Sequence, residues 1–354
     1  MKKANFSNNI DKTVASLVKS FSTRNRDIIT RRFGLKNGKK ETLESIGKSY
    51  GITRERVRQI EESTLVQMAK AVSGNSEVSK YISTAKNIIS EQGGIVKERD
   101  LFEAFSGSRD DNAVNASLVF ALTLDNELVK FPENDHFHAL WASDKNYLGA
   151  FKDTASSLIA TLSKAGKVVS RDDFYQLAKK SGVTAFESGQ LDDRHIELVL
   201  SVNKDISQNI FNQVGLTSWS EINPKGVRDK AYLVLKKESL PKHFGDIAKL
   251  INSYGFDSKK ANVQTVHNEL IKDNRFVLVG RGMYALNEWG YKPGTVKDVL
   301  MDILKDHGKP MPKAALVAKV MDSRMVKENT ILLNLQDSKI FKKNEDGHYV
   351  LKEA

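Results

Sequence analysis

The stretch Thr42–Glu61 reads TLESIGKSYGITRERVRQIE, and it decides the fold of the N-terminal part of the chain. Leu43 and Ile46 give a first short helix an apolar side. Gly51 can adopt the left-handed backbone conformation that ends such a helix. Thr53 is a good N-cap for a second helix. The stretch therefore predicts a helix-turn-helix.

The second predicted helix has an inner face and an outer face. Val57, Ile60 and Thr64 recur at spacings of three and four residues and face inward. The outer face carries the candidate base-reading residues Arg54, Glu55, Arg58 and Gln59. In the major groove Arg pairs with guanine, Glu accepts from cytosine and Gln pairs with adenine. A merely solvated charged helix face has a similar composition, so the pattern alone leaves both interpretations open.

A family resemblance favours the DNA-reading interpretation. The run from Arg31-Arg32-Phe33-Gly34-Leu35 through Thr42-Leu43-Glu44 to Thr53–Glu61 resembles region 4 of bacterial housekeeping-type sigma factors. The resemblance covers roughly residues 10–72, about a fifth of the chain. In that family, region 4 recognises the −35 promoter element and contacts the flap of the RNA polymerase β subunit. The resemblance implies base reading by the four outer-face residues and phosphate proximity for Arg31, Lys48, Thr53 and Arg56.

The chain also departs from that family. Full sigma factors carry, before region 4, a part that binds the polymerase clamp and melts the −10 element with exposed aromatic side chains. Only a short stretch precedes the similar segment in this sequence. We therefore expect that this chain does not open promoters alone.

Positive charge is concentrated in the sigma-like segment. Residues 1–75 hold nine Lys and seven Arg against seven acidic residues, a net charge of +9 out of +11 for the whole chain. A basic cluster of this kind is the electrostatic footprint of a nucleic-acid binder. The other 279 residues share a net charge of only +2, so we do not expect the whole chain to coat DNA.

Composition limits the remaining function classes. A chain of 354 residues with 40% hydrophobic and 28% charged residues is long enough for several small domains. There is no apolar run near 18 residues and no signal-peptide pattern, so we expect neither a membrane span nor secretion. The resemblance to sigma factors implies a place in the bacterial cytoplasm, associated with the nucleoid. The absence of cysteine excludes disulfides, thiolate zinc sites and cysteine nucleophiles.

Beyond the N-terminal segment the sequence repeats with a period of roughly 65–75 residues. Each unit has a long amphipathic helix, a short apolar piece after a Gly- or Pro-marked turn, two more helices and a two-strand hairpin. This is the winged-helix order. We predict a mainly α fold with small β hairpins (α+β), made of a helix-turn-helix domain at 1–73 and winged-helix repeats at 77–147, 150–222, 225–290 and 293–354.

The hairpins are predicted at 128–141, 210–219, 276–286 and 340–351. All three tryptophans lie at or just past the end of one of them: Trp141, Trp219 and Trp289. The third copy, from Leu240-Pro241-Lys242-His243-Phe244 to Met283-Tyr284-Ala285-Leu286, resembles the HARE-type winged helix. That family occurs in the δ subunit of bacterial RNA polymerase and in proteins acting on DNA or chromatin. The fourth copy fits it more loosely, and the first two fit by architecture only.

Four polar clusters suggest chemistry but have simpler explanations. Asp110-Asp111 and Asp192-Asp193 sit at predicted helix starts, where capping and the helix dipole favour Asp. His136 and His138 alternate on a predicted hairpin without a third metal ligand nearby. Gly280-Arg281-Gly282 lies between strands and lacks the Lys and Ser of a phosphate loop. We therefore expect no enzyme activity, no cofactor and no metal site.

The predicted winged helices differ in their suitability for DNA. In this fold the third helix usually enters the major groove, yet residues 112–125 contain no Lys or Arg. Because phosphate contacts supply much of DNA affinity, we expect the first repeat to bind protein or to act as a spacer. The third repeat is the strongest candidate of the four, with Lys259, Lys260, Lys272, Arg275 and Arg281.

The sequence thus predicts a sigma-like, sequence-specific DNA-binding transcription protein without its own promoter-melting region. Its expected partners are double-stranded DNA carrying a −35-like element and RNA polymerase, through the β flap. An alternative remains open, in which the chain is a δ-like accessory subunit of RNA polymerase that acts mainly through protein contacts.

Overall fold

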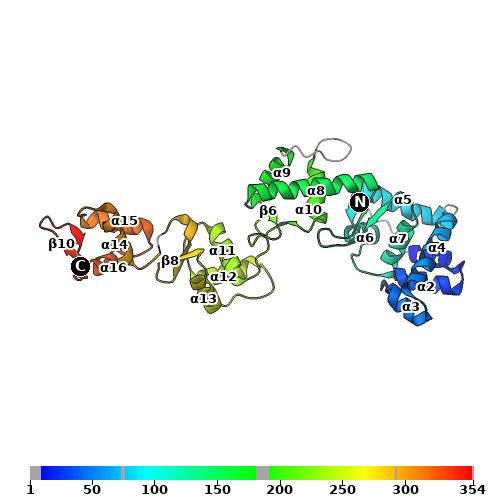
Figure 1. Ribbon diagram of the computed structural model, residues 1–354, viewed down its shortest axis with the longest axis horizontal. Helices are drawn as coiled ribbons and strands as arrows, with labels where there is room; N and C mark the ends of the chain where they lie inside the picture. Colours follow the sequence, from blue (N-terminus) through cyan, green and yellow to red (C-terminus); the bar gives the residue numbers. More distant parts are fainter. Residues whose placement is uncertain (1–8, 73–75, 181–190, 292, 353–354) are drawn as a thin grey trace. The chain divides into compact units, whose positions relative to one another are not determined.

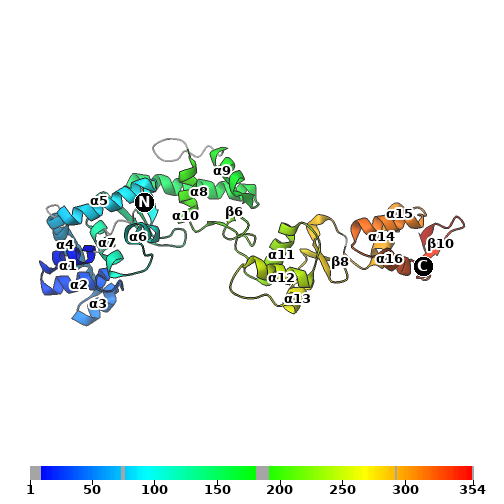
Figure 2. The same cartoon turned by 180° about the vertical axis from the view of Figure 1, so that it is seen from behind.

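The structure is a computed structural model that describes residues 9–72, 76–180, 191–291 and 293–352. The chain divides into two compact units, one running to Gln208 and including Asn212–Thr217, the other made of Asn209–Phe211 and the residues from Ser218 onward. Both units are mainly helical with small antiparallel sheets (Figures 1 and 2). Among the described residues, no helix has the length and apolar character needed to cross a membrane.

Four helices open the first unit: α1 (Ile10–Lys19), α2 (Thr23–Phe33), α3 (Leu43–Tyr50) and α4 (Arg54–Val72). Side-chain caps start α2 and α3, because Ser22 accepts a hydrogen bond from the Asn25 N–H and Thr42 accepts one from the Ser45 N–H. Left-handed glycines end α2 and α3, with φ of 71° at Gly34 and 64° at Gly51. The predicted left-handed helix end at Gly51 is therefore confirmed.

The helix-turn-helix has its own small core. Ile28, Ile46 and Val57 are fully buried together, and the partly buried side chains around them are Leu43, Tyr50, Ile52 and Ile60. Gly47 allows the close approach of the turn, since a Cβ there would lie 2.7 Å from the Ile52 carbonyl oxygen. This packing confirms the predicted helix-turn-helix.

A larger core joins these helices to the next module. Ile10, Val14 and Val18 of α1 belong to one buried cluster with side chains of α5 (Ser76–Glu91) and α7 (Ala113–Thr123). The rings of Phe33 and Phe120 meet edge to face, with centroids 5.1 Å apart. The sigma-like helices and the following module therefore share one hydrophobic core.

The rest of the first unit has two successive helix–strand–helix–helix–hairpin segments. The first contains α5, β1 (Ile95–Lys97), α6 (Glu98–Ser106), α7, β2 (Val129–Phe131) and β3 (Leu140–Ala142). The second contains α8 (Lys145–Ala165), β4 (Val169–Ser170), α9 (Arg171–Lys180), α10 (Asp193–Val202), β5 (Ile206–Gln208) and β6 (Gln213–Leu216). Their antiparallel sheets have the orders β1-β3-β2 and β4-β6-β5, so the last strand is central in both.

The second unit contains two further segments of this kind. One has α11 (Val227–Glu238), β7 (Lys242–His243), α12 (Phe244–Tyr254), α13 (Val263–Lys272), β8 (Phe276–Gly280) and β9 (Met283–Leu286), with sheet order β7-β9-β8. The other has α14 (Val296–His307), α15 (Lys313–Ser323), α16 (Glu328–Leu335), β10 (Phe341–Lys343) and β11 (Tyr349–Leu351). There a single bridge from Met311 to Tyr349 takes the place of the first strand.

The second hairpin differs from its prediction. Its strands lie at 206–208 and 213–216, with Ile206 opposite Leu216, rather than at 210–212 and 216–219. Asn212 has a φ of 61° in the turn. Phe211 packs edge-on against the ring of Tyr254, with centroids 5.1 Å apart. The apolar pair Ile210 and Phe211 suggested a strand. Phe211 instead lies outside the two strands and packs against Tyr254, which is distant in sequence.

Arg324 links the two segments of the second unit. Only 5% of this residue is exposed, and its guanidinium donates hydrogen bonds to the carbonyl oxygens of Leu278 and Gly294. The Met325 N–H donates to the Val279 carbonyl oxygen at 3.1 Å. A buried guanidinium is costly unless its donors are used, so these contacts hold the segments together.

The shared core of the first unit predicts that its parts unfold together. We expect Phe120→Ala to destabilise the unit by about 3–5 kcal/mol, the usual cost of removing a buried Phe ring. Native-state hydrogen exchange should show the loss of protection in α1 and α2 as well as in α5 and α7. Val66→Ala, at a side chain in α4 that is 59% exposed, is the control and should cost less than about 0.5 kcal/mol. Unchanged protection in α1 and α2 would contradict the shared core.

Candidate nucleic-acid interface

The four predicted base-reading residues lie together on the exposed side of the first turns of α4. Arg54, Glu55, Arg58 and Gln59 are all exposed, whereas Val57 between them is buried. Thr53 caps the helix, because its Oγ1 accepts a hydrogen bond from the Arg56 N–H at 3.2 Å. The structure thus forms one continuous polar surface at the N-terminal end of α4.

Arg58 and Glu55 form a tight ion pair on this surface. The guanidinium donates to both carboxylate oxygens of Glu55 at 2.7 and 2.9 Å, and also to Glu62 one turn further on. Hydrogen bonding from Arg58 lowers the pKa of Glu55, and the Glu55 carboxylate in turn raises the pKa of Arg58. Both groups are therefore charged and oriented before any ligand arrives. The sequence analysis missed Glu62, although its spacing of four from Arg58 was a usable signal.

Three of the four predicted phosphate-contacting residues surround one shallow depression. Lys48, Thr53 and Arg56 line it at the turn between α3 and α4, together with Gly47, Gly51 and Ile52. Its volume is about 440 Å³. The N-terminus of α4 opens onto this turn, and free N–H groups at a helix start favour anions. The site has the charge and donors that a phosphate requires.

Arg31 is placed differently from the other three. Its guanidinium donates to both oxygens of Glu41 at 2.9 and 2.7 Å, and to the Ser49 hydroxyl at 2.7 Å. Asp27 lies 3.5 Å away, and the side chain is only 24% exposed. Two carboxylates thus compensate its charge inside the domain. Arg31 thus contributes to the fold of the domain, and its contact with a phosphate stays a prediction.

A second buried contact fixes the direction of α4. The Arg32 guanidinium donates to Glu61 at 2.9 Å, where the Glu61 side chain is 14% exposed, and to the Glu41 carbonyl oxygen at 2.7 Å. These bonds tie α2 to the middle of α4. The partners are far apart in sequence, so no local spacing could have identified them.

The other polar clusters are explained by structure. Asp192 caps α10 in a capping box with His195, as expected. Asp111 pairs with Arg99 at 2.9 Å, while Asn112 is the cap of α7. His136 Nδ1 lies 2.8 Å from Asp205. Within the part of the chain that the structure describes, no three His, Asp or Glu side chains form a metal-binding group.

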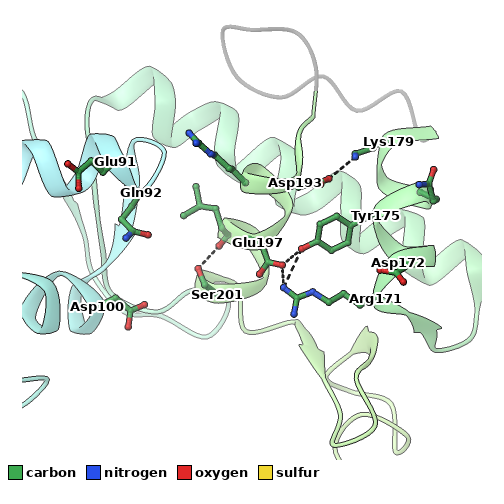
Figure 3. Close-up of a pocket in the computed structure, with 13 residues that line it drawn as sticks. Glu91, Gln92, Asp100, Arg171, Asp172, Tyr175, Lys179, Asp193, Glu197 and Ser201 are labelled. Atoms are coloured by element: carbon green, nitrogen blue, oxygen red, sulfur yellow. Dashed lines mark hydrogen bonds and ion pairs between the residues drawn. The ribbon is translucent and has the colours of Figure 1, made fainter. Parts of the chain in front are cut away.

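The first unit also contains a charged cleft of about 800 Å³ (Figure 3). Its charged lining has five carboxylates and three basic groups: Glu91, Asp100, Asp172, Asp193, Glu197, Arg171, Lys179 and Arg194. Glu197 receives hydrogen bonds from Arg171 and Tyr175, and Lys179 pairs with Asp193 at 2.6 Å. Because its charges are largely paired and the excess is negative, the cleft disfavours a polyanion.

Comparison with known proteins supports the assignment of the N-terminal segment. The family Sigma-70, region 4 matches residues 17–70. RNA polymerase sigma factor SigA of Nostoc sp. is 43% identical over 63 residues, which is 18% of this chain and 16% of the relative. SigA1 of Synechococcus elongatus is 39% identical over 66 residues, 19% of this chain and 16% of the relative. The principal sigma factor HrdD of Streptomyces coelicolor is 41% identical over 54 residues, 15% of this chain and 16% of the relative. The chain thus spans about a sixth of the length of these relatives.

The Arg58–Glu55 pair predicts a specific titration. We expect Arg58→Ala to raise the pKa of Glu55 toward its ordinary value of 4.5, because the guanidinium hydrogen bonds are lost. A lowered carboxyl pKa stabilises the folded chain above the ordinary value, and this contribution disappears as pH falls through the lowered value. Carbon-13 chemical shifts of the carboxyl group, followed by NMR against pH, measure it.

Lys48→Ala is the matched control for this titration. Lys48 is a neighbouring exposed cation that pairs with Glu44 instead, so its removal should leave the pKa of Glu55 unchanged. An ordinary pKa for Glu55 in the unaltered chain would show that the pair does not persist in solution.

Proposed function

We propose that this chain is a sequence-specific DNA-binding transcription protein, similar to sigma region 4, that recognises a −35-like promoter element through α4. One observation carries the proposal. The four candidate base-reading side chains share an exposed surface at the start of α4, beside a basic depression, in a segment that matches Sigma-70, region 4. The activity is binding without chemistry, and we propose no enzyme function and no cofactor.

The polar side chains at the start of α4 and beside it divide this binding between bases and phosphates. Arg58 donates two hydrogen bonds to the edge of a guanine, and Glu55 accepts one from a cytosine amino group. Arg54 and Gln59 extend the reading to neighbouring base pairs. Lys48, Thr53 and Arg56 hold phosphates, which sets the register of the helix on the duplex but carries no sequence information.

We further propose that the four segments after α4 are winged-helix repeats, at 77–147, 150–222, 225–290 and 293–354, with the third of the HARE type. Support comes from the recurring element order and from the three sheets with the last strand central. In the fourth segment the Met311–Tyr349 bridge occupies the position of the missing strand.

Docking on RNA polymerase completes the proposal. The sigma factors that resemble this segment are named as RNA polymerase proteins, and we propose that this chain contacts the β flap in the bacterial cytoplasm, at the nucleoid. Parts of α1 and α2 are already covered by α5 and α7. Docking would therefore use the surface of the sigma-like helices that this core leaves exposed.

A second candidate function is that of a δ-like accessory subunit. One observation favours it: residues 77–222 hold 15 basic and 21 acidic residues, a net charge of −6 that is unsuited to DNA. In that case the chain would act mainly through protein contacts. Tight binding to polymerase with only weak DNA binding at about 150 mM salt would favour this function over the first.

Selection of bound sequences from random duplex DNA at about 150 mM salt tests the proposed function. We expect the full chain to enrich a −35-like hexamer, and Arg58→Ala to lose preference at one base pair, at a cost of about 1–3 kcal/mol. The control is Arg109→Ala, another exposed arginine held by two carboxylates, Asp100 and Glu103. Two results would refute recognition through α4. One is that the full chain enriches no sequence, and the other is that Arg58→Ala enriches the same sequence as the unaltered chain.

A further inference from the structure

Carboxylates hold the Arg58 guanidinium on both of the edges that it could offer to a base. Nε and Nη2 form one edge, and both donate to Glu55, at 2.9 and 2.7 Å. Nη1 and Nη2 form the other edge, and Nη1 donates to Glu62 one turn further along α4. A guanine needs one complete edge, because its O6 and N7 atoms accept two parallel N–H bonds. A guanine that pairs with Arg58 therefore has to replace at least one carboxylate.

The three carboxylates in this part of α4 differ in their surroundings. Glu55 has a partner at the proposed interface, because it can accept from a cytosine amino group. Glu61 is only 14% exposed and is bonded to Arg32, so it serves the packing of α2 against α4. Glu62 is 58% exposed, and its contact is with Arg58. Glu62 is therefore the carboxylate whose bond a guanine has to replace.

The charge of this cluster also opposes DNA. One guanidinium lies between two carboxylates, and all three side chains are exposed, so the cluster is negative overall. Duplex DNA presents a dense row of negative phosphates, which repels such a cluster. The same residues that read bases thus carry an electrostatic cost of approach, and Glu62 contributes to it.

We propose that Glu62 competes with DNA for Arg58. In the free chain it occupies the guanidinium edge formed by Nη1 and Nη2, and a guanine displaces it from there. Glu62 is a positioning residue that acts through Arg58 and touches no base. The inference rests on the proposed function and deepens it, because it identifies a group that lowers the affinity of α4 for its own site.

The test measures the affinity of the full chain for two duplexes at about 150 mM salt, one with and one without the selected hexamer. We expect Glu62→Gln to raise the affinity for the hexamer duplex about fourfold. About twofold comes from the lost negative charge, and about twofold from the lost pair with Arg58, the usual size for an exposed pair one turn apart. On the duplex without the hexamer only the charge effect of about twofold should remain.

A double-mutant cycle isolates the contact between the two side chains. In the Arg58→Ala background, Glu62→Gln should raise the affinity for the hexamer duplex only about twofold, because no guanidinium is left to release. The matched control is Glu44→Gln, which removes another carboxylate of the sigma-like helices. Glu44 is 60% exposed and pairs with Lys48 instead, so the gain from its removal should be the same with and without Arg58→Ala.

Two results would overturn the inference. An equal gain from Glu62→Gln in both backgrounds would show that only its charge matters. An unchanged or lower affinity after Glu62→Gln would show that Glu62 orients Arg58 for reading and does not compete with the base.

Failure of the proposed function gives a different pattern. In that case the unaltered chain would show no preference between the two duplexes, and Arg58→Ala would not change its relative affinity for them. If competition by Glu62 alone is wrong, the preference and its reduction by Arg58→Ala both remain.

Discussion

The first unit depends on one shared hydrophobic core, in which the rings of Phe33 and Phe120 pack edge to face. Around it, α1, α2 and α4 contribute to the same buried cluster as α5 and α7. Helix α4 is thereby held near its C-terminal end by this core, through Met68 and Val72, and nearer its middle by the Arg32–Glu61 bond to α2. In return, α7 buries every residue from Asn115 to Leu122.

Charged side chains have different roles in different parts of the chain. On α4, Arg58 pairs with Glu55 and Glu62, and all three side chains stay exposed, so they can exchange partners at little desolvation cost. In the charged cleft between α9 and α10 the pairs serve the fold, and the excess is acidic. Arg31 shows that a basic residue of the sigma-like helices can serve the fold, because Glu41 and Asp27 use its donors.

Local signals predicted the elements well, and contacts distant in sequence explain the failures. The left-handed Gly51 and the Thr53 cap depend on a few neighbouring residues, so the sequence reveals them. The shared core and the Arg32–Glu61 bond join residues far apart, and no periodicity encodes such pairings. The second hairpin was predicted at the wrong residues. Phe211 looked like a strand residue because it is apolar, but it packs against Tyr254, which is distant in sequence.

The burial of α7 has a consequence for protein engineering. A designer who wished to graft the helix-turn-helix onto another protein could not cut after α4, because α1 would then present Ile10, Val14 and Val18 to water. Exposed apolar stripes of that kind promote self-association. The smallest portable piece therefore runs from α1 to the end of β3, more than twice the length of the motif that sequence comparison outlines.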